Sequence, residues 1–472
     1  MIDEIKPLVS TESDDPEYVH EVATVKRALE LWTMVPEFRE KFQADSQAAL
    51  DEYGLDVDAQ AVKIIAMHDE AVKYQDAPPE KIPRATRRYR GFMNEKKTDR
   101  DKMTAVDCRP DNPQFRAWRD RQRNRCWVEL GYRNHSLIHA PMTFELDLGC
   151  SVGCPFCGVA APKLSKVCRY EGDIPELWRG MLTFLKETVG SAAGSGTCYY
   201  ATEPLDNPDY EKFTDVFFDV FGVLPQITTA ASMRKPERTK KILADSQKKY
   251  RRIHRFSVLS ADVLKKIHDT FTAEELLLVE LLPQFADAPE CHLTKAGRSF
   301  GKDGKQFIEN EEGATISCIT GFVINVAERS IRLITPCGAN AEHPTGEIII
   351  DKKFFTDLDD FKKTFSDFIA KYMQKEFTTT QPLYLRDKVN YEETPEGIAF
   401  SHSSSMKFKF SGQDDLSPEI YHDVLRNLRD GGKTAREIAT ELMDTKDIEP
   451  ANVFFVLKKF ERAGLFREPY EI

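Results

Sequence analysis

Apolar positions divide the chain into a helical beginning, an alternating middle and a helical end. Near the N-terminus, Val22, Val25, Leu29 and Trp32 recur at helical spacing. From residue 143 to about residue 290, short apolar strands alternate with amphipathic helical stretches, which is typical of parallel strands in an α/β unit. Helical spacing returns after about residue 416. We therefore expect an α/β centre between two helical units.

The middle of the chain predicts five strands that alternate with helices, and the region after it predicts mainly antiparallel strands. The expected strands are Thr143–Gly149, Thr197–Leu205, Gln226–Ser232, Arg255–Ser260 and Leu276–Leu282, with helices at Pro175–Val189 and Pro208–Phe221. After Pro283 we expect a hairpin of Thr315–Val326 and Ser330–Thr335, a strand at Gly346–Asp351, a helix over 353–375 and antiparallel strands within Tyr384–Phe410.

Length and composition support several packed units. The 472 residues are 41% hydrophobic, and no apolar run approaches the length of a membrane-spanning helix. The first residues lack the apolar core of a signal peptide, and ten cysteines without a disulfide-like pattern favour a reducing compartment. We therefore expect a cytoplasmic protein with no membrane partner. The net charge of −11 leads us to expect no nucleic-acid partner.

Positive charge is concentrated between Lys81 and Arg125, which hold fifteen Lys and Arg against six Asp and Glu. Pro78, Pro79 and Pro83 separate this segment from the N-terminal helices. Three interpretations stay open: a solvated helix face, a docking surface for an acidic peptide, or an RNA-binding surface.

The most informative stretch is Cys150-Ser-Val-Gly-Cys154-Pro-Phe-Cys157, directly after the first expected strand. A short loop of this kind can direct three thiolates at one centre, and thiolates suit iron–sulfur clusters and zinc. A structural zinc site is usually closed by four ligands, and no fourth cysteine lies in this loop. The alternatives are a zinc site completed by Cys168 or a distant His, and three ordinary buried thiols.

The C-x3-C-x2-C spacing, with Phe156 before the last cysteine, resembles the cluster loop of the radical S-adenosylmethionine (SAM) superfamily. The resemblance implies a partial (β/α)6 barrel, a [4Fe–4S] cluster on Cys150, Cys154 and Cys157, and SAM bound to the open iron. It also implies that Phe156 lies against the adenine through its backbone. In barrels the chemistry gathers at the C-terminal ends of strands, where Cys150 is expected.

Two further stretches resemble SAM-binding motifs of this superfamily. Ala201-Thr202-Glu203-Pro204 resembles its Gly-Gly-Glu-Pro motif with Ala-Thr in place of Gly-Gly, which implies that Glu203 and nearby carbonyls bind the SAM ammonium. The alternative is a solvated glutamate at a strand end. Ser257 and Ser260 resemble the serine of the fourth-strand motif, which implies contact with the SAM ribose or carboxylate.

Both ends of the chain carry further resemblances. The stretch from Val35 to Leu55, with Pro36 and Gly54 as helix boundaries, resembles the nitrile-hydratase-like leader of some precursor peptides of ribosomally made natural products. The end resembles a small winged-helix domain, with a capping box from Thr434 to Glu437 and a wing expected at Gly464. The expected units are 1–75 (leader-like helices), 76–142 (basic connection), 143–290 (partial barrel), 291–412 (barrel closure and substrate cover) and 413–472 (winged-helix-like).

Cys337 lies between Pro336 and Gly338 at the expected end of a strand, where a thiol can stand close to a substrate backbone. With the single cysteine loop and the leader-like region, this arrangement resembles the radical SAM peptide epimerases of proteusin biosynthesis, the PoyD type. The resemblance implies that Cys337 donates a hydrogen atom while L-residues of a precursor peptide become D-residues. A buried structural role for Cys337 is the alternative.

The implied partners are a precursor peptide with a leader and an electron donor such as flavodoxin or ferredoxin. Two other functions stay open at this point. One is a radical SAM enzyme that forms a thioether or C–C crosslink in a peptide, and the other is a zinc-bound peptide-binding adaptor or winged-helix regulator.

Overall fold

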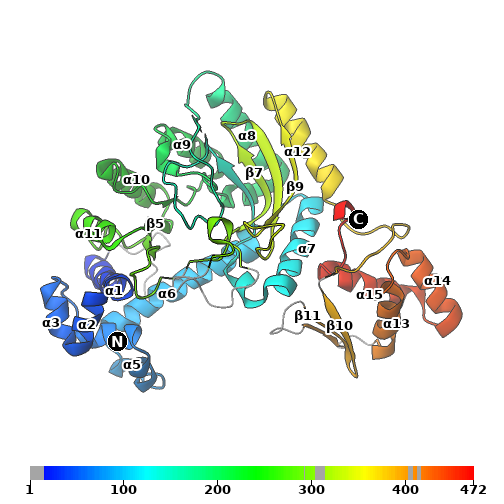
Figure 1. Cartoon of the computed structure of the whole chain (residues 1–472), viewed down its shortest axis with the longest axis horizontal. Coiled ribbons are helices and arrows are strands. Elements are labelled where there is room, and N and C mark those ends of the chain that lie inside the picture. The colour runs from blue at the N-terminus through cyan, green and yellow to red at the C-terminus, as the bar shows by residue number, and fades with distance from the viewer. Residues whose placement is uncertain are drawn as a thin grey trace.

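The computed structural model describes residues 15–291, 293–302, 314–387, 389–401, 408–411 and 416–471. Residues 1–14 of the expected leader-like module and the expected boundary at 412/413 lie outside the described residues. Within these ranges the chain is a mixed α/β protein, and none of its sheets closes into a barrel. Figure 1 shows the N-terminal helices at one end of the molecule, β7 and β9 in the centre, and α13–α15 with β10 and β11 at the other end.

The N-terminal helices form where the apolar spacing predicts them. Their bounds are α1 Pro16–Met34, α2 Pro36–Ala44, α3 Ser46–Glu52, α4 Ala59–Ala66 and α5 His68–Lys73. Pro36 occupies the first turn of α2, and Gly54 follows α3 with a φ of +66°, as the sequence predicts. The apolar stripe of α1 is buried, with Val25 and Trp32 packed against Phe38 and Phe42.

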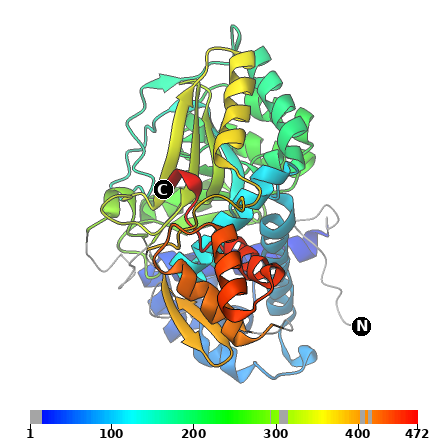
Figure 2. The same cartoon turned by 90° about the vertical axis from the view of Figure 1, so that its right-hand side faces the viewer.

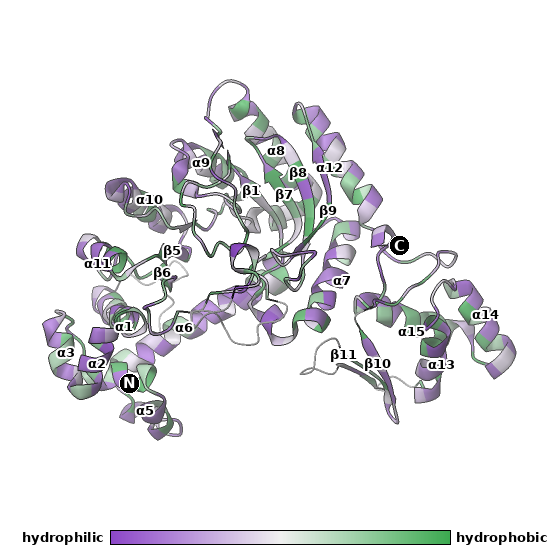
Figure 3. Ribbon diagram, in the orientation of Figure 1, coloured by the Kyte–Doolittle hydropathy of each residue, from purple (hydrophilic) through white to green (hydrophobic). Residues whose placement is uncertain are grey.

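The basic segment forms the long helices α6 (Arg84–Lys102) and α7 (Pro113–Leu130). Figure 3 shows α6 as a largely hydrophilic helix that runs from the N-terminal helices toward the central sheets. Four arginines of the segment are nevertheless buried, so a solvated helix face is the wrong interpretation for them. Three of them form ion pairs, Arg88 with Glu21, Arg121 with Glu468 and Arg125 with Glu129. The fourth, Arg119, donates to the carbonyl of His139.

The central four-stranded sheet has the order β1-β7-β8-β9. Its strands are β1 Ala140–Glu145, β7 Ile319–Asn325, β8 Ser330–Pro336 and β9 Glu347–Phe354. β1 and β7 are parallel, whereas β7–β8 and β8–β9 are antiparallel, so the expected hairpin and the strand after it are confirmed. The parallel pairing joins residues about 180 positions apart, for example Phe144 with Ile324.

A second sheet contains the parallel strands β4 (Thr228–Thr229), β5 (His254–Val258) and β6 (Val279–Pro283). β2 (Asp147–Leu148) pairs with β3 (Lys166–Val167). The expected strand Thr197–Leu205 was wrong as a regular element, because only its first part runs beside β1, where the Phe144 N–H donates to the Thr197 carbonyl at 2.8 Å. Gln226–Ser232 is likewise reduced to the two residues of β4.

Five helices cover these sheets: α8 Ile174–Val189, α9 Tyr210–Phe221, α10 Pro236–Lys249, α11 Ala261–Thr270 and α12 Leu358–Tyr372. The main core lies between the four-stranded sheet and α7, α8 and α12 (Figure 1). Phe144, Trp178, Phe322 and Phe365 are fully buried aromatic residues that join strand to helix in this core. This packing fixes β1, and with it the loop after β2.

The C-terminal unit combines a small sheet with three helices. Strands β10 (Asn390–Thr394), β11 (Gly397–Ser401) and β12 (Phe408–Ser411) are antiparallel, as expected, and α13 (Pro418–Leu428), α14 (Ala435–Lys446) and α15 (Pro450–Arg462) share one core with them. Figure 2 looks onto this flank, with the orange strands beside the red and orange helices. The capping box from Thr434 to Glu437 is present.

The expected wing after Gly464 was wrong. Leu465 and Phe466 instead run antiparallel to the segment before β10, where the Arg386 N–H donates to the Leu465 carbonyl at 3.0 Å and Leu385 bridges Phe466. Within the part of the chain that the structure describes, no helix has both the length and the apolar character needed to cross a membrane.

Candidate functional site

The cysteine loop begins one glycine after β2. Gly149 has a φ of +88°, and a Cβ at this position would lie 2.5 Å from the carbonyl oxygen of Lys163. Only glycine therefore lets the chain turn out of the sheet here while Cys150 bridges the backbone of Lys163. The first cysteine is fixed to the sheet through this turn.

The three cysteines of the loop differ in environment from most of the others. Cys150, Cys154 and Cys157 are half-buried, whereas six of the remaining seven cysteines are buried and Cys318 is half-buried. Backbone N–H groups point at two of the sulfurs, from Val152 to Cys150 Sγ and from Ala161 to Cys157 Sγ, each at 3.4 Å. Burial raises the pKa of Cys154, and the neighbouring charges of Cys157 and Cys150 raise it further.

Three thiols in one loop form a donor set that could hold an iron–sulfur cluster or take part in a zinc site. Hydrogen bonds to cysteine sulfurs stabilise thiolates and tune the potentials of iron–sulfur clusters. Among the described residues, no three His, Cys, Asp or Glu side chains gather as a ligand set for a single metal ion. Cys168, the local candidate for a fourth zinc ligand, packs in the main core.

Arg298 holds the loop from a segment that is distant in sequence. Its Nη1 donates to the carbonyl of Cys154 at 2.7 Å, its Nη2 donates to the carbonyl of Ala161, and its backbone N–H donates to the carbonyl of Cys157 at 3.0 Å. Sequence reasoning missed this residue, because no local motif marks it. The guanidinium thus bridges the middle of the loop, at Cys154, and the segment that follows it, at Ala161.

Glu203 is buried, with 4% of its surface exposed, so a solvated glutamate is the wrong interpretation. Its carboxylate accepts from the Thr229 hydroxyl at 2.5 Å, from the Ala230 N–H at 2.9 Å and from the Leu205 N–H at 3.1 Å. Burial raises its pKa, against the effect of these three donors. The carboxylate thereby joins the turn at Leu205 to the end of β4 at Thr229 and Ala230.

The turn that contains Glu203 contacts the cysteine loop. The carboxylate of Asp206 accepts from the Ser151 N–H at 2.9 Å and from the Ser151 hydroxyl at 2.5 Å. Arg234 donates to the same Asp206 carboxylate at 2.9 Å. The structure therefore brings together two motifs that the sequence separates by about fifty residues.

The other expected SAM contacts are spread around this centre. The Ala201 N–H donates to Glu145 Oε1 at 2.9 Å, and Thr202 is half-buried beside it. Ser257 lies within β5, opposite Leu282. The Ser260 hydroxyl accepts from the Val263 N–H at 3.2 Å and so caps α11, which explains a serine at this position without a ligand.

Phe156 packs its ring against a small apolar cluster of Ala288, Cys291 and Leu293, in the segment after β6. The side chain thus anchors the cysteine loop by apolar packing, whereas Arg298 holds it through hydrogen bonds. Two segments from beyond β6 therefore support the loop.

Cys337 directly follows β8 and is 4% exposed. Its N–H donates to the Gly346 carbonyl at 2.9 Å, which extends the pairing of β8 with β9 by one step. Burial raises the pKa of its thiol to about 12, so the sulfur carries its proton at neutral pH. Arg125 fixes this strand end by donating to the Pro336 carbonyl at 2.5 Å.

A buried polar network lies between Cys337 and the Glu203 turn. The Tyr200 hydroxyl donates to Glu347, and Arg332 donates to Glu145 Oε2 at 2.9 Å, where Asn325 also donates. Sequence reasoning missed this network. Its signal was the polar face of the first strand, because Thr143, Glu145 and Asp147 alternate with apolar residues although both faces of that strand are covered.

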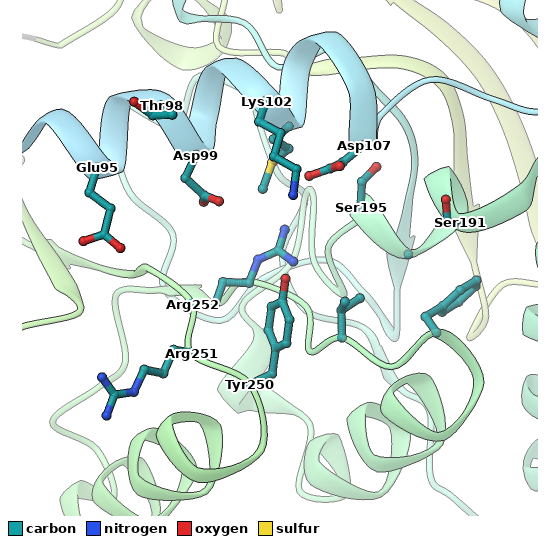
Figure 4. A pocket seen from close by; sticks show the side chains of 14 residues that line it. Glu95, Thr98, Asp99, Lys102, Asp107, Ser191, Ser195, Tyr250, Arg251 and Arg252 are labelled. Atoms are coloured by element: carbon teal, nitrogen blue, oxygen red, sulfur yellow. The ribbon is translucent and has the colours of Figure 1, made fainter. Parts of the chain in front are cut away.

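A separate cavity of about 710 Å³ lies away from these residues. Figure 4 shows Asp99 and Lys102 of α6 facing Tyr250 and Arg252 across it. Tyr250 and Arg252 precede β5, whereas Ser260 comes after it, so the cavity lies at the opposite end of this parallel strand from the candidate site.

Comparison with known proteins gives one relative without an assigned activity. No protein-family model matches the chain, and no solved structure matches it. The uncharacterized protein y4wI of Sinorhizobium fredii is 33% identical over 354 residues, which cover 73% of this chain and 68% of that protein. At this identity and coverage the chain belongs to the same family as the uncharacterized protein y4wI.

Proposed function

We propose that the chain is a radical SAM epimerase that converts L-residues of a ribosomally made precursor peptide to D-residues. The observation that carries the proposal is the loop of Cys150, Cys154 and Cys157 beside the buried carboxylate of Glu203. In this proposal the three thiolates hold a [4Fe–4S] cluster, and the two sheets are parts of a partial (β/α)6 barrel. Ala201, Thr202, Glu203, Ser257 and Ser260 would hold SAM, which would also bind the cluster.

When bound, the cluster and SAM supply a one-electron cleavage and a carbon radical that removes the hydrogen from a substrate Cα. The residues of the chain determine the fate of the planar Cα radical. Cys337 donates its hydrogen atom to this radical from the opposite face, so the S–H bond breaks and a new C–H bond forms. The sulfur-centred radical returns to a thiol with one electron, from a flavodoxin-type or ferredoxin-type donor, and one proton from water.

The environment of Cys337 supports this role. A hydrogen-atom donor must hold its S–H bond, and burial raises the pKa of this thiol to about 12 although Arg125 lies nearby. A thiolate, the reactive form in metal binding and nucleophilic attack, is thereby disfavoured. Glu347, which lies opposite Pro336 and accepts from the Tyr200 hydroxyl, is buried as well, so this strand end offers little room for water.

The outer units supply candidate surfaces for the leader of the precursor. The N-terminal helices have the leader-like sequence, and the C-terminal unit of α13–α15 has the winged-helix-like pattern. Both flank the central sheets, and we propose that at least one of them binds the leader while the core peptide reaches Cys337. A cytoplasmic location agrees with a reduced cluster.

The experiment is a turnover in D2O with a precursor peptide encoded beside the gene, using anaerobically purified protein. Epimerisation places one solvent deuterium at each inverted Cα, since a thiol hydrogen exchanges with water. Each D-residue, scored after hydrolysis, should therefore coincide with a gain of about one mass unit. A loss of two hydrogens without D-residues would instead identify a crosslinking enzyme.

A further inference from the structure

β9 is the terminal strand of the central sheet and begins at the candidate site. It pairs with β8 on one side, and within the described ranges no other strand pairs with it. Its first residue, Glu347, accepts from the Tyr200 hydroxyl and lies opposite Pro336, the residue before Cys337. One end of this sheet edge is therefore part of the site.

The register determines which backbone groups of β9 point away from the sheet. In an antiparallel ladder, hydrogen-bonded pairs alternate with pairs whose N–H and C=O groups point outward. The Cys337 N–H donates to the Gly346 carbonyl, so the N–H and C=O groups of the next pair, Pro336 with Glu347, do not bond to each other. This position suits a proline, which has no N–H to donate to the partner strand. Two steps further, Ile334 with Ile349 is again outward-pointing.

The other end of β9 gives the same result independently. The Phe355 N–H donates to the Arg329 carbonyl at 2.9 Å, so the neighbouring pair of Ser330 with Phe354 points outward, and so does Arg332 with Lys352. The Lys352 N–H indeed donates away from β8, to the carboxylate of Asp351 at 2.7 Å. The register shifts by one residue between Leu333 and Ile334, which makes the outward-pointing positions at the two ends of β9 consistent with each other.

Two of the outward-pointing positions also carry exposed apolar side chains. Ile349 is 51% exposed and Phe354 is 61% exposed, in a strand whose other end is buried. Charged side chains usually protect such a sheet edge from pairing with another strand, and Lys352 and Lys353 protect part of β9 in this way. The segment around Ile349 keeps an outward N–H, an outward C=O and an apolar side chain about 7 Å along the strand from Glu347.

We propose that the edge of β9 around Ile349 binds an extended segment of the peptide substrate as an additional strand. Main-chain hydrogen bonds to Ile349 hold the segment, and Ile349 and Phe354 contact its apolar side chains. Because β9 begins at Glu347, opposite Pro336, a segment docked along this edge extends toward Cys337. This inference rests on the proposed function for the identity of the peptide, whereas the docking itself needs neither cluster nor SAM.

The test uses the full-length protein as purified and a fluorescein-labelled peptide of alternating Thr and Val residues, flanked by lysines for solubility. Its matched control is the same peptide N-methylated at every internal residue, which keeps the side chains but removes the backbone donors. Fluorescence anisotropy should detect binding of the first peptide. We expect the N-methylated peptide to bind at least roughly tenfold more weakly.

Two protein variants locate the contact. Ile349→Pro removes the outward N–H that the docked strand needs, and a proline is tolerated at such an edge position. Lys352→Pro is the matched control, because its outward N–H already donates to Asp351. We expect roughly tenfold weaker peptide binding for Ile349→Pro and little change for Lys352→Pro. Circular dichroism checks that both variants fold.

Several results would overturn the proposal. These are equal binding of the two peptides, equal binding by Ile349→Pro and the parent protein, or no binding of the unmethylated peptide. A dimer that Ile349→Pro dissociates would also overturn it, because a second copy of the chain would then occupy the edge. If Ile349→Pro fails to fold, the comparison of the two peptides on the parent protein still decides the question. Since docking is measured without SAM, failure of SAM cleavage tests the proposed function separately.

Discussion

Glu203 and Cys150 share one electrostatic environment although they come from separate motifs. Burial raises the pKa of the Cys150 thiol, and the negative charge of Glu203 adds to that rise. The contact of Ser151, next to Cys150, with Asp206, three residues after Glu203, brings the two motifs together. A bound cation, whether the iron of a cluster or the ammonium of SAM, would offset the cost of burying these two negative charges and would reduce their mutual repulsion. The pair is therefore suited to binding positive charge.

Arg298 should control how firmly the cysteine loop retains iron. We expect that Arg298→Ala, after anaerobic reconstitution, loses iron to a chelator several-fold faster than the parent protein, because the carbonyls of Cys154 and Ala161 lose their shared donor. Lys302→Ala is the control, since its ammonium makes one long contact, at 3.4 Å, with the Pro155 carbonyl. Equal rates of iron loss for all three proteins would remove Arg298 from the support of the loop.

Asp147 should make the stability of the core depend on pH. Burial raises its pKa from its ordinary value of 3.8 to about 6, against the effects of hydrogen bonds from Asn207 and the Cys168 N–H. Between about pH 4 and about pH 6 the folded chain therefore binds more protons than the unfolded chain. Its free energy of unfolding should fall as the pH rises through this window, by about 3 kcal/mol from this group.

Asp147→Asn should remove that part of the pH dependence, because an amide does not titrate in this range. Urea unfolding at several pH values between about 4 and 8 measures the effect in both proteins. If the two proteins show parallel profiles, Asp147 does not titrate with a raised pKa.

Arg121 and Glu468 should make a large contribution to the attachment of the C-terminal segment. They form two contacts, at 2.9 and 3.0 Å, and both side chains are buried. Arg121→Ala leaves a buried carboxylate without its main partner, so we expect the free energy of unfolding to fall by about 3–5 kcal/mol. Arg109→Ala removes the exposed pair with Asp120 at 3.5 Å and should cost less than about 1 kcal/mol. Comparable losses from both would contradict this account.

Cys337 should be required for inversion but not for removal of the Cα hydrogen. We expect that Cys337→Ala still produces 5′-deoxyadenosine with the precursor peptide but yields at least tenfold fewer D-residues in D2O. Cys318→Ala and Cys126→Ala are matched controls, because Cys318 precedes β7 and Cys126 donates to the Pro336 carbonyl at 3.3 Å from α7. If Cys126→Ala alone abolishes inversion, the donor is the neighbouring thiol.

Local patterns predicted much of the fold. Helical spacing located α1–α4, the hairpin of β7 and β8 was evident from its apolar runs, and the Thr434–Glu437 capping box fixed the start of α14. The pairing of β1 with β7 could not be predicted, because it depends on packing between segments about 180 residues apart. The expected strand at Thr197–Leu205 failed because the chain there makes single hydrogen bonds to Thr143 and Glu145 instead of a regular ladder.

The candidate site was partly predictable for the same reason. The cysteine loop and Glu203 lie in short motifs whose spacing carries chemical information. Arg298, Tyr200 and Glu347 contribute through contacts across the fold, and nothing in their local sequence indicates these contacts. Of the three interpretations left open for the basic segment, the solvated helix face fails for Arg121 and Arg125, because both are buried and paired with acidic side chains.

The cleavage of SAM tests the central claim most directly, because it requires no substrate peptide. The parent protein and the variant with Cys150, Cys154 and Cys157 all changed to Ala are reconstituted anaerobically with iron and sulfide, then incubated with SAM and dithionite. The account predicts that the parent binds iron and sulfide and forms 5′-deoxyadenosine and methionine, while the folded triple variant does neither. Equal formation of 5′-deoxyadenosine by the triple variant, or a parent protein that binds no iron, would contradict it.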